Sequence, residues 1–152
     1  MAVIEHAIEI AAPIDRVFAV SQDYAVRYNW DPFPRSLTLL DNSGEVGIGS
    51  RTRVVGKSGL AMTVAFVQWR PPFVAAIVMT EGPWLFQRFA GSWTFRIAAE
   101  NRTWVKFRYV VKLRHWALPW LSEPIAALWF GWDVKARLRG LKHYCEKDFA
   151  KT

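Results

Sequence analysis

Residues 102–114 read RTWVKFRYVVKLR, and this stretch decides the fold. Every second residue from Thr103 to Leu113 is apolar, aromatic or threonine. The residues between them are mostly Lys or Arg, interrupted by Trp104 and Val110. A period of two places the two sets on opposite faces of a β-strand. The stretch therefore predicts a strand over about 103–114, in a sheet with one covered face and one wet face.

The chain before this stretch continues the same pattern. Gly91, Trp93, Phe95 and Ile97 alternate with small or polar residues, which predicts a neighbouring strand over about 85–98. Further strands are expected at about 3–10, 37–40, 50–57, 60–69 and 73–80. Short links join them, among them Lys57-Ser58-Gly59, Arg70-Pro71-Pro72 and a turn over 41–44. Because parallel strands need long crossovers, the sheet is expected to be antiparallel.

Two short helices are expected after the first strand. Pro13 suits the first turn of a helix that holds Ile14, Val17 and Phe18 at helical spacing. A second short helix is predicted over about 23–29, with Asp23 as its N-cap. The prolines of the sequence Trp30-Asp31-Pro32-Phe33-Pro34 then end helix formation.

A long helix is expected at the C-terminal end. We expect it to begin at about Ser122, with Ser122 as cap and Pro124 in the first turn. Its first half is apolar on several sides, which predicts that this half is buried. Its second half carries an apolar stripe of Val134, Leu138, Leu141, Cys145 and Phe149 against a basic face that includes Lys135, Arg137, Arg139, Lys142 and Lys147.

The composition indicates one folded domain over 1–152. Of 152 residues, 52% are hydrophobic, and 10 Phe, 9 Trp and 4 Tyr can fill a sizeable core, which excludes disorder and coiled coil. The net charge of +7 lies entirely in residues 101–152, which hold eleven basic and four acidic side chains. Solvated faces rich in Lys and Arg explain this excess, and an anionic partner is the alternative.

The number of cysteines and the first ten residues indicate which cellular compartment to expect. A single Cys145 can form neither an internal disulfide nor a Cys-based zinc site. The opening MAVIEHAIEI carries two glutamates where a signal peptide would be basic and then apolar. No stretch is long and apolar enough for a transmembrane segment. We therefore expect a cytoplasmic protein. We expect it to be a monomer or a homodimer.

The order of elements and a set of short motifs together resemble the SRPBCC, or START-like, helix-grip superfamily, and within it the bacterial polyketide cyclase/dehydrase and lipid-transport family. The motifs are residues 12–18 (APIDRVF), 30–32 (WDP), 46–50 (VGIGS), 70–72 (RPP), 91–95 (GSWTF) and 138–144 (LRGLKHY). The resemblance implies an α+β helix-grip fold: a curved antiparallel sheet of about seven strands around the long C-terminal helix. It also implies an apolar cavity between the sheet and that helix.

Four residues are candidates for acid–base chemistry, although none forms a known catalytic motif. They are His6 on the apolar face of the first strand, Asp31 before Pro32, Glu81 in a loop, and Tyr109. For His6 the alternative is a core histidine, and for Asp31 and Glu81 it is an ordinary turn or loop residue. There is no metal-binding His pair and no phosphate loop, so we expect neither a metal nor a cofactor.

The aromatic residues point to the expected function, which is the binding or transport of a hydrophobic small molecule, either lipid-like or polyketide-like. Large aromatic rings can form the walls of an apolar chamber, and such walls suit a flat or isoprenoid ligand. The candidate contacts are Trp30, Trp93, Phe107, Tyr109, Trp129 and Trp132, with the first short helices and the loop carrying Trp84 as gates. One alternative is a polyketide aromatase/cyclase or dehydratase. A second is a basic module that contacts RNA, the ribosome or an anionic membrane. Of these partners, nucleic acid has the thinner support.

Overall fold

The computed structural model describes residues 1–40 and 46–150, apart from the side chain of residue 148, so the turn expected over 41–44 lies outside the described residues. Its helices are α1 (Ile14–Gln22), α2 (Tyr24–Arg27), the short 3₁₀ helix η1 (His115–Ala117) and α3 (Pro119–Ala150). Its strands are β1 (Ala2–Ile10), β2 (Pro34–Leu39), β3 (Arg51–Gly56), β4 (Ala61–Arg70), β5 (Val74–Glu81), β6 (Phe86–Ala99) and β7 (Arg102–Leu113).

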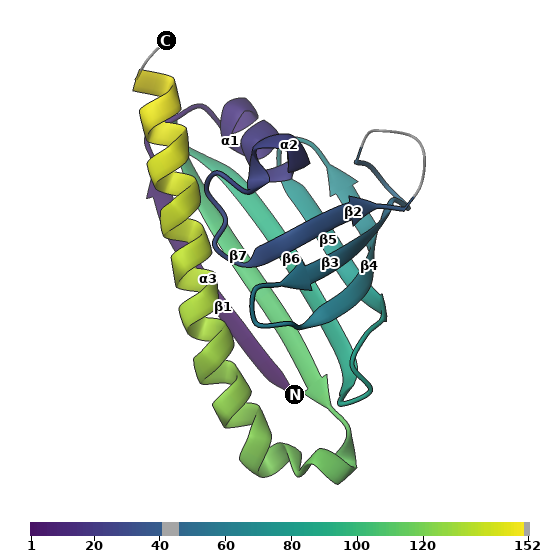
Figure 1. Ribbon diagram of the computed structural model, residues 1–152. Coiled ribbons are helices and arrows are strands. Elements are labelled where there is room, and N and C mark those ends of the chain that lie inside the picture. Colours follow the sequence, from purple (N-terminus) through teal and green to yellow (C-terminus); the bar gives the residue numbers. More distant parts are fainter. Residues whose placement is uncertain (41–45, 151–152) are drawn as a thin grey trace.

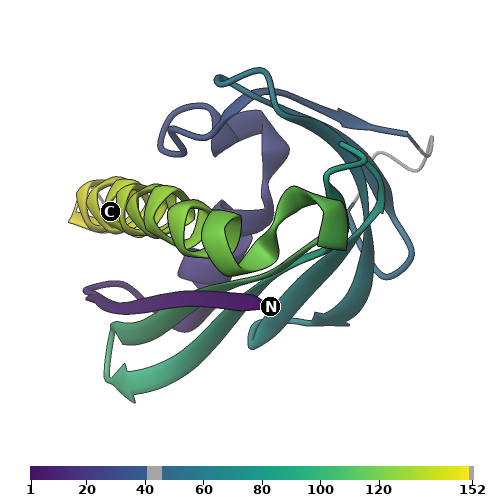
Figure 2. The same cartoon turned by 90° about the horizontal axis from the view of Figure 1, so that it is seen from below.

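The seven strands form one antiparallel sheet in the order β1-β7-β6-β5-β4-β3-β2. The sheet curls so that β2 and β3 swing over its concave face, and α3 runs along that face beside β1 and β7 (Figures 1 and 2). Helices α1 and α2 close one end of the curl (Figure 1). This arrangement confirms the expected fold class, with two short helices after the first strand and a long C-terminal helix.

Strand β7 supplies the centre of the core, as its period of two predicts. All six residues of the alternating set from Thr103 to Leu113 are buried. Phe107 lies opposite Trp93 of β6 and His6 of β1, and Tyr109 lies opposite Gly91. Directly opposed residues share a face, so these side chains all point toward the concave side of the sheet.

Helix α3 begins earlier than expected, at Pro119 rather than at about Ser122. Pro119 therefore takes the first-turn position that the sequence reading gave to Pro124. Ser122 is not the cap: its hydroxyl donates to the carbonyls of Ala117 at 2.8 Å and Leu118 at 3.1 Å. Pro124 lies inside the helix and lacks the N–H that would bond to the carbonyl of Trp120, a residue that is 75% exposed and so open to water.

The expected burial of the first half of α3 is wrong. Ile125 and Leu128 are each 65% exposed and Trp132 is 70% exposed. The helix has 32 residues and a length of about 48 Å, whereas the 12-residue strand β7 spans about 40 Å. The start of α3 therefore extends past the end of the sheet (Figure 1). Within 1–40 and 46–150, no helix combines the length and apolarity needed to span a bilayer.

Candidate functional site

A cavity of about 80 Å³ lies between the concave face of the sheet and the segment that leads from α1 through α2 into β2. Residues of β3 to β7 form its floor and far wall, and α3 contributes one residue, Arg137. Most of the lining is apolar. The polar lining residues are Gln22, Tyr24, Arg27, Tyr109 and Arg137. An apolar chamber with a few polar groups is the usual form of a small-molecule site.

Asp31 holds the two arginines of the cavity wall together. Its carboxylate accepts a hydrogen bond of 2.7 Å from Nε of Arg27, and bonds of 2.9 to 3.2 Å from Nε and Nη2 of Arg137. The backbone N–H of Phe33 donates to it at 3.0 Å. Burial by itself would raise the pKa of Asp31, but the two guanidiniums and the Phe33 N–H outweigh burial. Its pKa therefore lies below the ordinary value of 3.8, and Asp31 is ionised.

Tyr109 extends this network toward α3. Nη1 of Arg137 donates to the Tyr109 hydroxyl, which in turn donates to Oδ2 of Asp133 at 3.3 Å. Burial raises the pKa of Tyr109 well above its ordinary value of 10.0, so the phenol stays protonated at neutral pH. Burial also raises the pKa of Asp133, which is half-buried. Tyr109 is therefore equipped to give and accept hydrogen bonds, and poorly equipped to release a proton.

Two cationic side chains, Arg27 and Arg137, line the cavity, and none of the described residues that line it is a carboxylate. Arg27 and Arg137 are both buried, and Asp31 is the fully buried carboxylate that pairs with them. The guanidinium of Arg137 also lies over the ring of Phe107, 4.7 Å from its centre. Arg27 uses Nε on Asp31 and Nη1 on the carbonyl of Ser21 at 2.7 Å, but no described residue accepts from its Nη2. This N–H group remains available to a ligand.

Three of the predicted ligand contacts line the cavity: Trp93, Phe107 and Tyr109. Trp30 and Asp31 are buried directly behind its wall. The Trp30 ring packs edge-on against Trp93 with ring centres 6.0 Å apart, and its Nε1 has no hydrogen-bond partner among the described residues. Of the four candidate acid–base residues, Tyr109 is the one that reaches the cavity, and Asp31 acts on it through the arginines.

The other predicted site residues lie elsewhere. His6 points to the expected face, but α3 covers it there, since a Cβ added at Gly131 would lie 3.9 Å from its Nε2, and His6 does not line the cavity. Burial and Lys135 lower the pKa of His6. Glu81 is exposed at the end of β5. Trp129 and Trp132 do not share the chamber with Trp93 and Phe107, because α3 turns them outward.

Sequence reasoning missed both arginines. It placed Arg137 on the solvated face of the last helix, whereas Arg137 is buried. The helical spacing could have indicated this burial. Arg137 lies three residues after Val134 and four before Leu141, which places it on the same face of the helix as these two residues of the buried stripe. Arg27 is the last residue of the four-residue helix α2, where Asp23 caps the N-terminus by accepting from the N–H of Ala25. A helix of four residues is too short to show a helical repeat of apolar residues, so the sequence gives no indication that Arg27 is buried.

A second hollow, a groove of about 460 Å³, opens at the end of the sheet where α3 begins. Leu60, Leu85, Leu113, Ile125 and Trp129 are among its lining residues. Three rings separate it from the cavity. Phe86 and Phe130 line the groove and Phe89 lines the cavity, with the ring centre of Phe89 5.6 Å from Phe86 and 5.5 Å from Phe130.

The curled sheet, the long helix laid along it and the apolar cavity define a START-like, helix-grip protein. More narrowly, the chain belongs to the polyketide cyclase/dehydrase and lipid transport family, whose model matches residues 1–146. The expected family is therefore confirmed. A comparison with curated proteins finds no match.

Several solved structures share the fold at low sequence identity. A START superfamily protein from Mycobacterium smegmatis superposes with a TM-score of 0.79 at 15% identity, covering 95% of this chain and 97% of that one. A protein from Thermus thermophilus gives 0.78 at 19% identity, covering 93% and 95%. The Zhui aromatase/cyclase from Streptomyces sp. R1128 gives 0.76 at 18% identity, covering 96% and 94%. At such identities the likeness establishes the fold alone.

Proposed function

We propose that the protein binds a hydrophobic small molecule, lipid-like or polyketide-like, that carries an acidic oxygen from a carboxylate or an enol, and that this oxygen accepts a hydrogen bond from Arg27 in the cavity. The observation that carries the proposal is Nη2 of Arg27, from which no described residue accepts a hydrogen bond, beside an apolar chamber lined by two buried arginines and no carboxylate. A hydrogen bond to an ionised partner is about twice as strong as a neutral one. An anionic or enolic oxygen therefore matches this site better than a wholly apolar ligand does.

Ligand entry requires the cavity to widen. A volume of about 80 Å³ holds several waters, since each needs at least about 10–15 Å³, whereas sites for drug-sized ligands measure about 300–1,000 Å³. The wall formed by α2 and β2 is the part most able to move, because α2 is one turn long and β2 is the edge strand. Side-chain bonds tie this wall down: the Tyr24 hydroxyl pairs with Thr52 at 2.9 Å, and the N–H of Leu37 donates to Tyr28 at 2.7 Å.

Two measurements test the proposal. Native mass spectrometry of the freshly purified chain should show a bound hydrophobic mass, which denaturing extraction then identifies by class. Titration with cis-parinaric acid, a fluorescent fatty acid, should show saturable binding, and its methyl ester should bind at least about tenfold more weakly, since it offers Arg27 no charge.

A matched pair of variants locates the binding. Gly91 lines the cavity, and the atoms nearest to a Cβ there belong to Tyr109 at 3.4 Å and Ile77 at 3.5 Å rather than to the arginines, so Gly91→Val adds bulk to the cavity from its apolar floor. Ala90→Val adds bulk at the next residue, on the opposite face of the same strand. Gly91→Val should abolish parinaric acid binding and Ala90→Val should retain it. Equal affinity of the two variants, or of acid and ester, would overturn the proposal.

A second candidate function is a polyketide cyclase or aromatase, favoured by the position of Tyr109 in the cavity. With the raised pKa of its phenol, Tyr109 would keep its proton and polarise a substrate carbonyl by hydrogen bonding, with its O–H turning from Asp133 to that carbonyl. Turnover of a poly-β-ketone that disappears in Tyr109→Phe, with parinaric acid still bound, would support this function. Binding without turnover of any such ketone would leave the protein as a carrier.

A further inference from the structure

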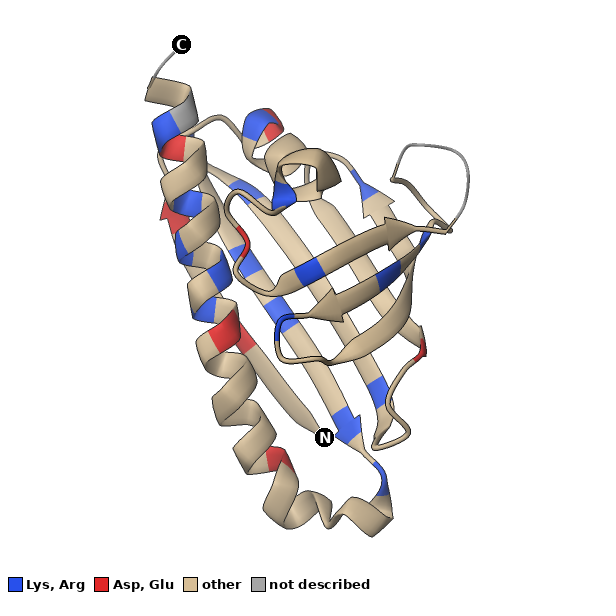
Figure 3. Cartoon of the chain, viewed as in Figure 1, with Lys and Arg blue, Asp and Glu red and all other residues tan. Residues whose placement is uncertain are grey.

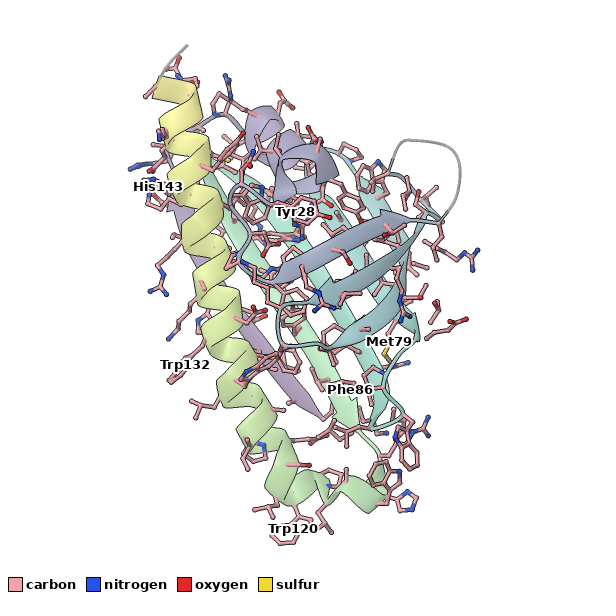
Figure 4. All side chains as sticks on the ribbon, viewed as in Figure 1. Tyr28, Met79, Phe86, Trp120, Trp132 and His143 are labelled. Atoms are coloured by element: carbon pink, nitrogen blue, oxygen red, sulfur yellow. The ribbon has the colours of Figure 1, made fainter. Side chains whose placement is uncertain are left out.

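One end of the molecule exposes large apolar side chains that the fold does not cover. On α3, Leu121, Ile125, Leu128 and Trp132 recur at intervals of four, three and four residues and are between 51% and 70% exposed. This spacing places them in one stripe along the helix. The stripe lies on the side of the helix opposite the buried Phe130, although Ile125 also lines the groove, and Trp132 points outward from the ribbon (Figure 4).

Three tryptophans extend this surface around the tip of the molecule. Trp120, at the start of α3, and Trp84, in the loop before β6, are each 75% exposed, and Trp120 lies at the extreme end in Figure 4. The ring of Trp84 lies 4.8 Å from that of Trp116, which belongs to η1. Three separate segments of the chain therefore contribute to one surface, which we call the apolar end. It consists of these three tryptophans and the stripe on α3.

Basic residues flank the apolar end. Arg88 and Lys112 lie side by side on β6 and β7, and the Nε of Arg114 donates to the carbonyl of Trp84. No described carboxylate forms a salt bridge with any of the three. Glu123 also lies near, but it is paired with the N-terminal amine at 2.8 Å. Figure 3 shows the basic positions at this end of β6 and β7.

We propose that the apolar end docks on the surface of an anionic lipid bilayer. Tryptophans favour the headgroup region, where an apolar ring and a polar N–H are both accommodated. An apolar stripe on a helix lies in the same interface, and flanking Lys and Arg attract anionic headgroups. The docked face would place the mouth of the apolar groove, which Ile125 and Trp129 line, against the lipid.

A bilayer fits this surface better than a second copy of the chain. A two-fold interface over this surface would gather the basic residues of both copies in one interface, where no described carboxylate pairs with them, and such an excess of like charge opposes association. An anionic bilayer instead complements them. The inference does not depend on what the cavity binds, because docking uses residues outside the cavity and is measured without any cavity ligand.

The test is co-sedimentation of the full chain with lipid vesicles. The protein should sediment with vesicles of equimolar phosphatidylcholine and phosphatidylserine, and markedly less with phosphatidylcholine alone. Added salt should weaken the binding, since it screens the basic side chains. Failure to sediment with the anionic vesicles would overturn the proposal, whatever the result of the parinaric acid titration.

Two isoleucines provide a matched control. Ile125 in the stripe is 65% exposed, and Ile97, near the far end of β6, is 66% exposed. Ile125→Ser should lower vesicle partitioning about tenfold, and Ile97→Ser should leave it unchanged. Equal partitioning of the two variants would overturn the proposal. So would a dimer, seen by sedimentation velocity without lipid, that Ile125→Ser dissociates, because the surface would then bind a second copy.

Discussion

Asp31 and Arg137 lie 106 positions apart in the chain, yet their side chains form a buried bidentate ion pair. Nε of Arg137 donates to Oδ1 at 3.1 Å and Nη2 donates to Oδ2 at 2.9 Å. The pair joins the segment after α2 to the middle of α3 at the wall of the cavity, which Arg137 lines. The same carboxylate also holds Arg27, so one buried anion orients both cations of the proposed site.

Replacing Asp31 by Asn should strongly destabilise the protein. The change leaves Arg27 and Arg137 buried without their counter-ion, and breaking a buried pair in this way typically costs about 3–5 kcal/mol of unfolding free energy. Urea unfolding followed by circular dichroism measures the difference. Glu5→Gln is the control, since Glu5 pairs only at the surface with Lys106 and Arg108 and should cost at most about 1 kcal/mol. Equal losses would contradict a structural role for Asp31.

Asp31 should also make stability sensitive to acid. Because its pKa in the folded state lies below the ordinary 3.8, its stabilising contribution is complete above pH 3.8 and is lost as the pH falls through the folded-state value. The raised pKa of Asp133 acts in the opposite sense, so its contribution declines as the pH rises above 3.8. Glu123 and Glu146 also have lowered pKa values and act in the same sense as Asp31, so the background for the test is Asp133→Asn combined with Glu123→Gln and Glu146→Gln. Unfolding free energies of this background, measured across this range, should still fall in acid. A flat profile would contradict the assignment.

Gly140 is required because α3 passes against the backbone after α2. A Cβ at Gly140 would lie 2.1 Å from the carbonyl oxygen of Trp30, so Gly140→Ala must push the helix away and should cost about 1–3 kcal/mol or more. Gly131 in the same helix is the control, because its Cβ would meet nothing closer than 3.9 Å. Gly131→Ala should instead stabilise by about 0.5–1 kcal/mol. Thermal unfolding of both variants provides the comparison, and a neutral Gly140→Ala would show that the contact relaxes freely.

The strands and the order of elements were predictable because their signal is local. The alternation over 102–114 survives in the fold, with Phe107 and Tyr109 buried where the period of two places them. The polar part of the site was not predictable, because it depends on a contact between distant segments. Nothing near Arg137 in the sequence indicates that Asp31 lies opposite it, and a basic residue among other basic residues is typically solvated.

The first half of α3 shows the other limit of sequence reasoning. Its apolar residues indicate a surface that avoids water, but not what covers it. The sequence reading assigned that role to the core. The helix instead extends past the sheet, so Ile125, Leu128 and Trp132 remain exposed. Which side chains reach the core depends on the relative lengths of α3 and β7, and no local pattern encodes that comparison.

The ring of Phe89 should control passage between the groove and the cavity. It lines the cavity and packs against Phe86 and Phe130 of the groove, so Phe89→Ala should join the two hollows. Stopped-flow fluorescence should then show parinaric acid leaving at least about tenfold faster, since the ring no longer obstructs the path.

Phe95→Ala is the matched control for this change in rate. Phe95 is buried on the same face of β6 but does not line the cavity, so both variants should lose a similar stability of about 3–5 kcal/mol. Only Phe89→Ala should accelerate release. If either alanine variant does not fold, the corresponding leucine pair makes the same comparison. Equal release rates from the two variants would mean that ligands enter elsewhere, and the wall formed by α2 and β2 would then be the remaining route.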